Sequence, residues 1–117
     1  MKLVKLIKLP YFQEANGSLV IAESNNELID FEIKRVFNVR ASIGDVRGQH
    51  AHHRCSQLLI CSFGSIEVKC SDSLSSEIYI LDEPNIGMLI EPGIWAEQKY
   101  LENDSILTVI CDRLYEE

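Results

Sequence analysis

Short apolar or alternating runs recur at roughly even spacing along the chain, separated by segments rich in glycine, proline, asparagine and serine. Runs of this kind with such flanks are typical of β-strands joined by turns. The first run, residues 2–9, also fits a helical stripe, and a helix remains an alternative there. The pattern as a whole predicts an all-β sandwich or barrel, and we expect a double-stranded jelly-roll barrel. The strands are expected over 2–9, 18–22, 31–40, 57–62, 66–70, 77–81, 88–90, 95–101 and 105–112, the last two as a pair.

The polar segments between these runs predict turns and surface loops. Asn16-Gly17 is a strong hairpin-turn signal, and the asparagine-rich residues 23–30 indicate a loop. Residues 71–76, rich in serine and aspartate, predict a surface loop, and residues 114–117 a polar tail. No internal repeat or linker divides the sequence, so we expect a single domain over 1–117.

The stretch 44–64, GDVRGQHAHHRCSQLLICSFG, carries the candidate chemistry. His50 and His52 are two residues apart, so on a strand both imidazoles point to one face, while His53 points to the other. Two imidazoles on the inward face of a small barrel form a chemical site. The alternative is a pair of hydrogen-bonded core histidines, and the nearby Arg47 favours the functional interpretation.

The donor set around the histidines does not match a metal site. Zinc and iron usually take at least three protein ligands, with histidine and carboxylate typical. The residue spaced to complete the set is Gln57, a weak neutral ligand, and residues 92–96 supply no further histidine. We therefore interpret His50 and His52 as proton carriers that use no metal or other cofactor. An imidazole with a pKa of ~6.5 takes and returns protons at cellular pH, which suits proton movement beside a ketone.

The net charge of −7 argues against a nucleic-acid partner, because phosphate backbones need a basic surface. Positive charge nevertheless gathers around the histidines, and a basic patch in an acidic protein suits a small anionic ligand. Arg47 is the strongest phosphate-binding candidate, because a guanidinium grips a phosphate with two parallel bonds. An ion pair with Asp45 or a glutamate is the alternative. The basic residues of this patch are Lys34, Arg35, Arg40, Arg47 and Arg54, of which Arg40 and Arg54 are interpreted as solvated.

At 117 residues, 46% of them hydrophobic and 25% charged, the chain is long enough to bury a core and ordinary for a soluble protein. Its N-terminal run is interrupted by lysines, and no stretch approaches the ~18 apolar residues that span a bilayer. We therefore expect a cytoplasmic protein with no signal peptide and no membrane contact. The four cysteines form no C-x-x-C pair, and we expect reduced, partly buried thiols and no zinc site.

These motifs together resemble a known family. The first cupin motif has a characteristic spacing, and the same spacing is found here in Gly44, His50, His52, Gln57 and Gly64. Gln57 stands where cupin metal sites usually have glutamate. A wider match, to the sugar-nucleotide 3,4-ketoisomerases (the FdtA or WxcM-like cupins), is carried by residues 31–37, 47–52, 57–58, 87–92 and Trp95. The resemblance extends from about Leu19 to about Asp112. It implies a cupin jelly roll and a homodimer in which an N-terminal strand is exchanged between subunits.

The resemblance also implies an isomerase. The family converts a nucleotide-linked 4-keto-6-deoxyhexose to the 3-keto isomer through an enediol, and we expect the nucleotide to be dTDP. In this sequence His52 would be the base that takes the proton from C3, and His50 would orient it or share in returning a proton at C4. Members of the family often act before an aminotransferase in the synthesis of 3-amino sugars for surface polysaccharide such as O-antigen.

Further residues are implicated in substrate binding by the same resemblance. The family usually has an Asp-x-Arg-Gly stretch, and Asn16 replaces its arginine here, which bears on the substrate, the stereochemistry at C4 or activity itself. His53 stands where the family often has lysine, so it is either a phosphate contact or a solvated histidine. Trp95 either stacks on a base or sugar or packs the barrel as a buried residue. The substrate-binding candidates are Arg47, Arg35, His53, Gln57, Asn16 and Trp95, with Gln57 bonded to the histidines or to the sugar and Arg35 to the diphosphate or in a salt bridge.

Two other functions stay open at this point. One is a sugar-nucleotide-binding cupin that has lost catalysis, which is motivated by the missing arginine at Asn16. The other is a metal-dependent cupin such as a small dioxygenase, which stoichiometric metal in the purified protein would reveal.

Overall fold

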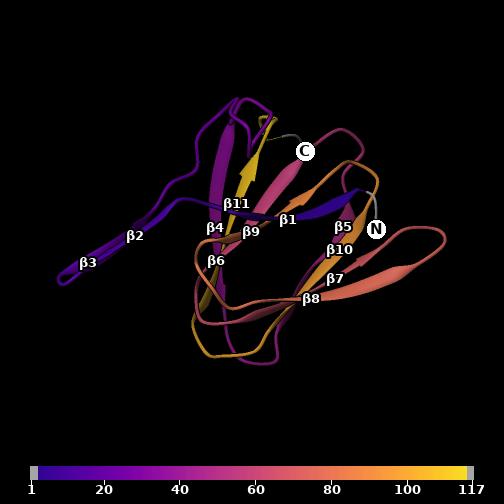
Figure 1. Ribbon diagram of the computed structural model, residues 1–117. Helices are drawn as coiled ribbons and strands as arrows, with labels where there is room; N and C mark the ends of the chain where they lie inside the picture. Colours follow the sequence, from indigo (N-terminus) through magenta and orange to yellow (C-terminus); the bar gives the residue numbers. More distant parts are fainter. Residues whose placement is uncertain (1–2, 116–117) are drawn as a thin grey trace.

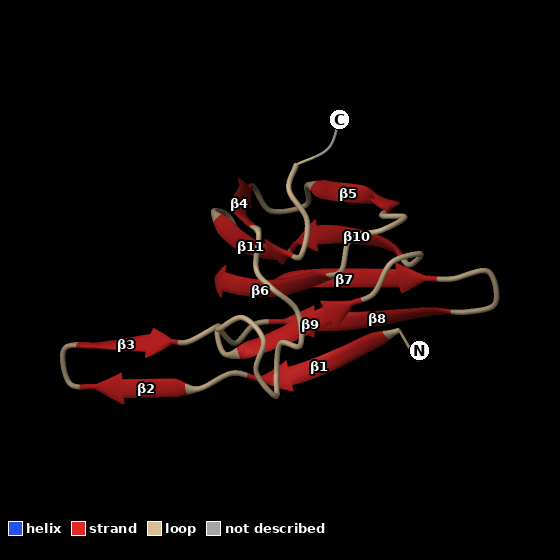
Figure 2. Ribbon diagram, turned by 90° about the horizontal axis from the view of Figure 1, so that it is seen from above, coloured by secondary structure: helices blue, strands red, loops and turns tan. Residues whose placement is uncertain are grey.

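The computed structural model describes residues 3–115, which form two facing antiparallel β-sheets and a separate hairpin (Figures 1 and 2). One sheet has five strands in the order β1 (Val4–Lys8), β9 (Ile86–Ile90), β6 (Gln57–Phe63), β11 (Ser105–Cys111) and β4 (Arg35–Ala41). The other has four in the order β5 (Val46–Ala51), β10 (Trp95–Tyr100), β7 (Ile66–Ser71) and β8 (Ser76–Leu81). Because the chain passes repeatedly from one sheet to the other, the fold is a jelly roll, and the predicted fold class is confirmed.

The core lies between the two sheets and is built from alternate strand positions. Along β7, Ile66, Val68 and Cys70 are buried, whereas Glu67 and Lys69 face away from the core. This alternation is typical of a sheet with one covered face. Burial of each such aliphatic side chain stabilises the fold by about 1.5–3 kcal/mol.

β6 differs from β7 because both of its faces are covered. Leu59 belongs to the core between the sheets, whereas Leu58 and Ile60 pack on the outer face against a second apolar cluster. That cluster includes Ile29 and Phe31, from the segment that precedes β4. The continuous apolar run of β6 therefore reflects burial on both sides.

Several strand boundaries differ from the predictions. β4 begins at Arg35 rather than at Phe31, because Phe31 and Ile33 are used to cover the outer face of the five-stranded sheet. The Asn16-Gly17 turn is confirmed, but β2 (Tyr11–Glu14), which pairs across it with β3 (Gly17–Val20), was not predicted. Residues 1–2 and 116–117 lie outside the described residues.

The expectation that the last two strands pair with each other is wrong. β10 lies between β5 and β7, and β11 lies between β6 and β4. The turn over 102–104 carries the chain from one sheet to the other. Two runs joined by three polar residues look the same in sequence whether they form a hairpin or such a crossing, so the pattern could not distinguish them.

The β2–β3 hairpin stands apart from both sheets and projects away from them (Figures 1 and 2). It exposes two large apolar side chains, Phe12 and Leu19. Asn16 lies at its tip. Over residues 3–115, no helix has the length and apolar character needed to cross a membrane.

Candidate active site

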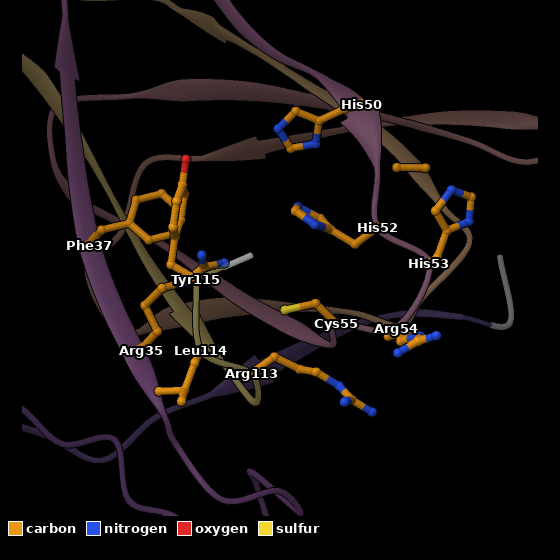
Figure 3. A pocket seen from close by; sticks show the side chains of 11 residues that line it. Arg35, Phe37, His50, His52, His53, Arg54, Cys55, Arg113, Leu114 and Tyr115 are labelled. Carbon is orange, nitrogen blue, oxygen red and sulfur yellow. The ribbon is translucent and has the colours of Figure 1, made fainter. Parts of the chain in front are cut away.

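His50 and His52 face the same space at one end of the barrel (Figure 3). Their ring centroids are 4.7 Å apart and the ring planes meet at 80°, which is an edge-to-face contact. His50 lies near the end of β5 and is exposed, and His52 directly follows the strand and is partly buried. His53 points away from the pair. The shared face that the spacing predicts is therefore confirmed.

A β-bulge in β5 decides which side chains accompany this pair. The φ of Gly48 is 84°, and the register with β10 shifts there, so that Arg47 lies opposite Gln98 and His50 opposite Ala96. Gln98 and Ala96 are both buried. Because directly opposite residues point to the same face of a sheet, Arg47 and His50 both face inward. In a regular strand, residues three apart would face opposite ways.

Gln57, the first residue of β6, holds the ring of His52. Its Nε2 lies 3.1 Å from His52 Nε2, and only 9% of the residue is exposed. An amide turned by 180° presents either its NH2 or its carbonyl group, so Gln57 can bond to this nitrogen in either tautomer of the ring. The expected bond between Gln57 and the histidines is present.

The pKa of His52 is lowered below the 6.5 of a free imidazole. Burial is the largest cause, followed by the charge of His50 and then that of Arg35. Each of these disfavours the protonated ring. These three causes all favour the neutral ring, which is the form that can accept a proton.

Arg35 begins β4 and places its guanidinium at the wall of the site. Its Nη2 donates to Cys111 Sγ at 3.4 Å, and this hydrogen bond raises the pKa of Arg35. The guanidinium lies over the rings of Phe37, at 5.2 Å, and Tyr115, at 5.6 Å. Within the described residues, the buried Nε of Arg35 has no hydrogen-bond partner. A buried donor left unpaired costs about 1–3 kcal/mol. Arg35 also lines the cavity, so a small shift of its side chain would let the guanidinium bond to a ligand there.

A cavity of about 860 Å³ opens beside the histidines (Figure 3). Its walls carry the guanidinium groups of Arg35, Arg54 and Arg113, and no acidic residue is found among the described residues that line it. Phe37 and Tyr115 supply an apolar wall. The volume lies within the range of small-molecule sites, roughly 300–1,000 Å³, and the charge suits an anionic ligand.

Residues 2–117 match the family model described as FdtA: WxcM-like, C-terminal. This chain belongs to the FdtA family. Over 114 residues it is 33% identical to the TDP-4-oxo-6-deoxy-alpha-D-glucose-3,4-oxoisomerase of Aneurinibacillus thermoaerophilus, a match that covers 97% of this chain and 81% of the relative. The resemblance inferred from the sequence motifs is thereby confirmed.

Solved structures of similar proteins agree with this membership. QdtA, a sugar 3,4-ketoisomerase from Thermoanaerobacterium thermosaccharolyticum in complex with TDP, superposes with a TM-score of 0.92 at 30% identity, over 97% of this chain and 83% of that one. The WlaRB TDP-quinovose 3,4-ketoisomerase from Campylobacter jejuni gives a TM-score of 0.92 at 32% identity, over 99% and 89% of the two chains.

The predicted substrate-binding residues of this FdtA-family chain divide into two groups. Arg35 and His53 line the cavity, and Gln57 is bonded to His52. Arg47 faces inward but is not among the residues that line the cavity. Trp95 and Asn16 lie elsewhere: the first is 41% exposed and the second occupies the tip of the projecting hairpin.

One structural expectation needs correction, and one that is confirmed needs an addition. Trp95 is opposite Ala51, on the other face of β10 from the buried Ala96, so it is not a buried packing residue of the barrel. Arg54 is exposed as expected, yet it lines the cavity, because the chain turns sharply after β5. Arg40 is solvated as expected, with its Nε 3.9 Å from Asp104 Oδ1.

Sequence reasoning missed several residues of the site. Cys55, Arg113, Leu114 and Tyr115 line the cavity; the last two belong to the predicted tail and line it while they remain exposed. Phe37 could have been found, because it alternates with Arg35 along β4. The tail carries no periodic signal, so only the fold could place it beside the histidines.

The four cysteines are free and buried, as expected for reduced thiols. Among residues 3–115, no group of three or more histidine, cysteine or acidic side chains is placed to hold a metal ion.

Proposed function

We propose that this protein is an isomerase that converts a TDP-linked 4-keto-6-deoxyhexose to its 3-keto isomer. The observation that carries the proposal is the contact between His50 and His52 beside a cavity with positively charged walls. The relatives described as a 3,4-oxoisomerase and 3,4-ketoisomerases support the same reaction.

In the proposed mechanism, neutral His52 takes the proton from C3 of the sugar. The C–H electrons form a C3–C4 double bond, and the ketone oxygen at C4 takes a proton, which gives an enediol. Loss of the proton from the oxygen on C3 then forms the new ketone while C4 gains a proton. Because Gln57 occupies Nε2 of His52, we assign proton transfer to Nδ1, in the tautomer whose Nε2–H donates to the carbonyl oxygen of the turned Gln57 amide. His50, in edge contact with the ring, orients it and shares in returning the proton at C4.

The diphosphate of the substrate is proposed to lie along the basic wall. Arg35 has a buried, unpaired Nε within the described part of the chain and is the first candidate to contact it. Arg47 and His53 are proposed to extend this anion site, with Arg54 and Arg113 nearby on the lining. Trp95 is not among the residues that line the cavity, so its stacking role is not part of this proposal.

The decisive experiment incubates the protein in D2O with TDP-4-keto-6-deoxyglucose, and with its uridine-linked counterpart. We expect deuterium at the carbon beside the ketone and formation of the 3-keto product, both lost in His52→Asn. His53→Asn is the matched control, because this ring points away from the pair; it should weaken binding without abolishing exchange. No exchange and no product with any such sugar contradicts the proposal.

A second candidate is a binding protein that retains the pocket without catalysis. Asn16 in place of the family's arginine favours it. TDP-sugar binding that survives His52→Asn, with no turnover by the parent protein, would establish this function instead.

We further propose a homodimer in which the N-terminal β2–β3 hairpin is exchanged between single-domain subunits. The hairpin pairs with neither sheet of its own chain and exposes Phe12 and Leu19. Exchange would bury these side chains and bring Asn16 toward the partner. Light scattering should give a dimer for the parent protein and a monomer for Phe12→Ser/Leu19→Ser. Leu74→Ser, at a 93% exposed loop position, is the control and should stay dimeric.

We also propose that the enzyme works in the cytoplasm. Its four free thiols are typical of a reducing compartment.

The 3-keto product has the carbonyl that an aminotransferase needs, which fits a role in making 3-amino sugars.

A further inference from the structure

Three inward-facing residues form one row across neighbouring strands at the mouth of the barrel. Cys111 on β11 lies directly opposite Arg35 on β4 and directly opposite Gln57 on β6. Directly opposite side chains share a face, with Cβ atoms about 4.5–5.5 Å apart. Cys111 is therefore flanked on both sides by polar side chains, although it is itself fully buried.

Both neighbours lie within hydrogen-bond distance of the thiol. Arg35 Nη2 lies 3.4 Å from Cys111 Sγ, and Gln57 Nε2 lies 3.7 Å from it. The same amide nitrogen of Gln57 lies 3.1 Å from Nε2 of His52. A continuous chain of contacts thus runs from the imidazole through the amide and the thiol to the guanidinium.

We propose that Cys111 is a positioning residue, which fixes the catalytic base and the anion-binding arginine relative to each other. The thiol acts on the base through Gln57 and on the anion site through Arg35. This inference rests on the proposed function, in which His52 takes the proton and Arg35 contacts the diphosphate. The sugar carbon is brought to the base only if the diphosphate is held at a set distance from it, so a fixed row serves both tasks.

The chemistry of a thiol suits this position. A thiol both donates and accepts weak hydrogen bonds, so it can pair with either orientation of the Gln57 amide while it accepts from Arg35. An alanine or valine would leave the amide and the guanidinium beside an apolar wall. The cost of a buried polar group without a partner would then favour other side-chain rotamers.

The test compares Cys111→Ala with Cys111→Ser and with Cys61→Ala. Cys61 is a matched control, because it is a buried thiol of the same sheet and core, and it donates to Phe63 O at 3.3 Å, away from the histidines. We expect Cys111→Ala to lower kcat and the affinity for TDP about tenfold each, as the loss of a bond to a charged group implies. Cys111→Ser, which keeps a donor and an acceptor, should stay within about threefold of the parent protein. Cys61→Ala should lower Tm to a similar extent and leave kcat and TDP affinity unchanged.

A substrate-independent measurement separates this inference from the proposed function. The ¹⁵N shift of His52 Nε2 reports its bond to Gln57, and we expect it to change in Cys111→Ala and not in Cys61→Ala. If the parent protein fails to turn over the sugar, the proposed function is wrong, and the ¹⁵N shift still decides the role of Cys111. The inference is overturned if Cys111→Ala matches Cys61→Ala in the ¹⁵N shift, kcat and TDP affinity, or if Cys111→Ser does not restore them.

Discussion

β6 and β5 meet at the site but are built in different ways. β6 lies in the middle of the five-stranded sheet, and its first five residues, Gln57–Cys61, are all buried. β5 lies at the edge of the four-stranded sheet, and Val46–His50 are all exposed. β6 keeps one register along β9 and shifts its register with β11 only at its far end, between Cys61 and Phe63, whereas β5 is bulged beside the histidines, where Gly48 and Gln49 adopt positive φ.

The difference shows that the residues that determine the fold and the residues that determine the chemistry lie on different kinds of strand. β6 is defined by apolar burial on both faces, and it supplies one polar residue to the site, Gln57, at its start. The irregular strand is free to bulge because one edge has no neighbour in the sheet, and bulges are common at edges and beside active sites. The bulge turns Arg47 to the same face as His50. Four substitutions test this contrast between the two strands.

The largest effect is expected where β5 ends. His52→Asn keeps the approximate shape of the ring but removes the base, so kcat should fall by about 10²–10⁴-fold, the usual contribution of a general base. Steady-state kinetics on TDP-4-keto-6-deoxyglucose measure it, and Tm should change little because His52 is only partly buried. A loss below tenfold would mean that another group removes the proton.

A substitution in the buried part of β6 is expected to lower stability rather than activity. Leu59 is 1% exposed within the core, so Leu59→Ala should lower the free energy of unfolding by about 2–5 kcal/mol. Urea unfolding measures this change. The kcat of the remaining folded protein should stay near that of the parent; a selective loss of kcat would show that the scaffold strand also tunes the chemistry.

The bulge itself is tested by Gly48→Ala. Its φ of 84° disfavours any side chain, and a Cβ there would lie 2.5 Å from Gln98 Oε1. We expect a loss of about 1–3 kcal/mol in stability, together with a reduced kcat, because the register around His50 is disturbed. Gly44→Ala is the control, since its φ of 89° is similar but a Cβ would meet nothing within 4 Å. It should cost stability through backbone strain alone, and equal kcat losses in the two variants would contradict a special role for the bulge.

The smallest effect is expected in the pH profile. The lowered pKa of His52 means that its neutral form persists to lower pH, so the acid limb of kcat/KM should have its midpoint below 6.5. Arg35→Met removes one of the three causes of this lowering, and the midpoint should move upward. A midpoint above 6.5 in the parent protein, or no upward movement in the variant, would show that another group controls the acid limb.

How much of the structure could be predicted from the sequence also differs between the buried strands and the site. The apolar runs of β6, β7 and β11 predicted these strands and the all-β class, because buried strand positions are occupied by apolar residues in a recognisable pattern. The H-x-H spacing predicted correctly that His50 and His52 share a face. The start of β4 was misplaced because Phe31 and Ile33 are apolar for a different reason, namely that they cover the outside of the sheet.

The sequence alone determined the family, the jelly roll and the pair of imidazoles, because local alternation and residue spacing act within one strand. Only the tertiary structure decided that Arg47 turns inward, that the tail reaches the cavity at Tyr115, and that Cys111 stands between Arg35 and Gln57. These relations join strands that are distant along the chain. They depend on register, a bulge and sheet order, which arise when the two sheets pack and which no single segment of the sequence encodes.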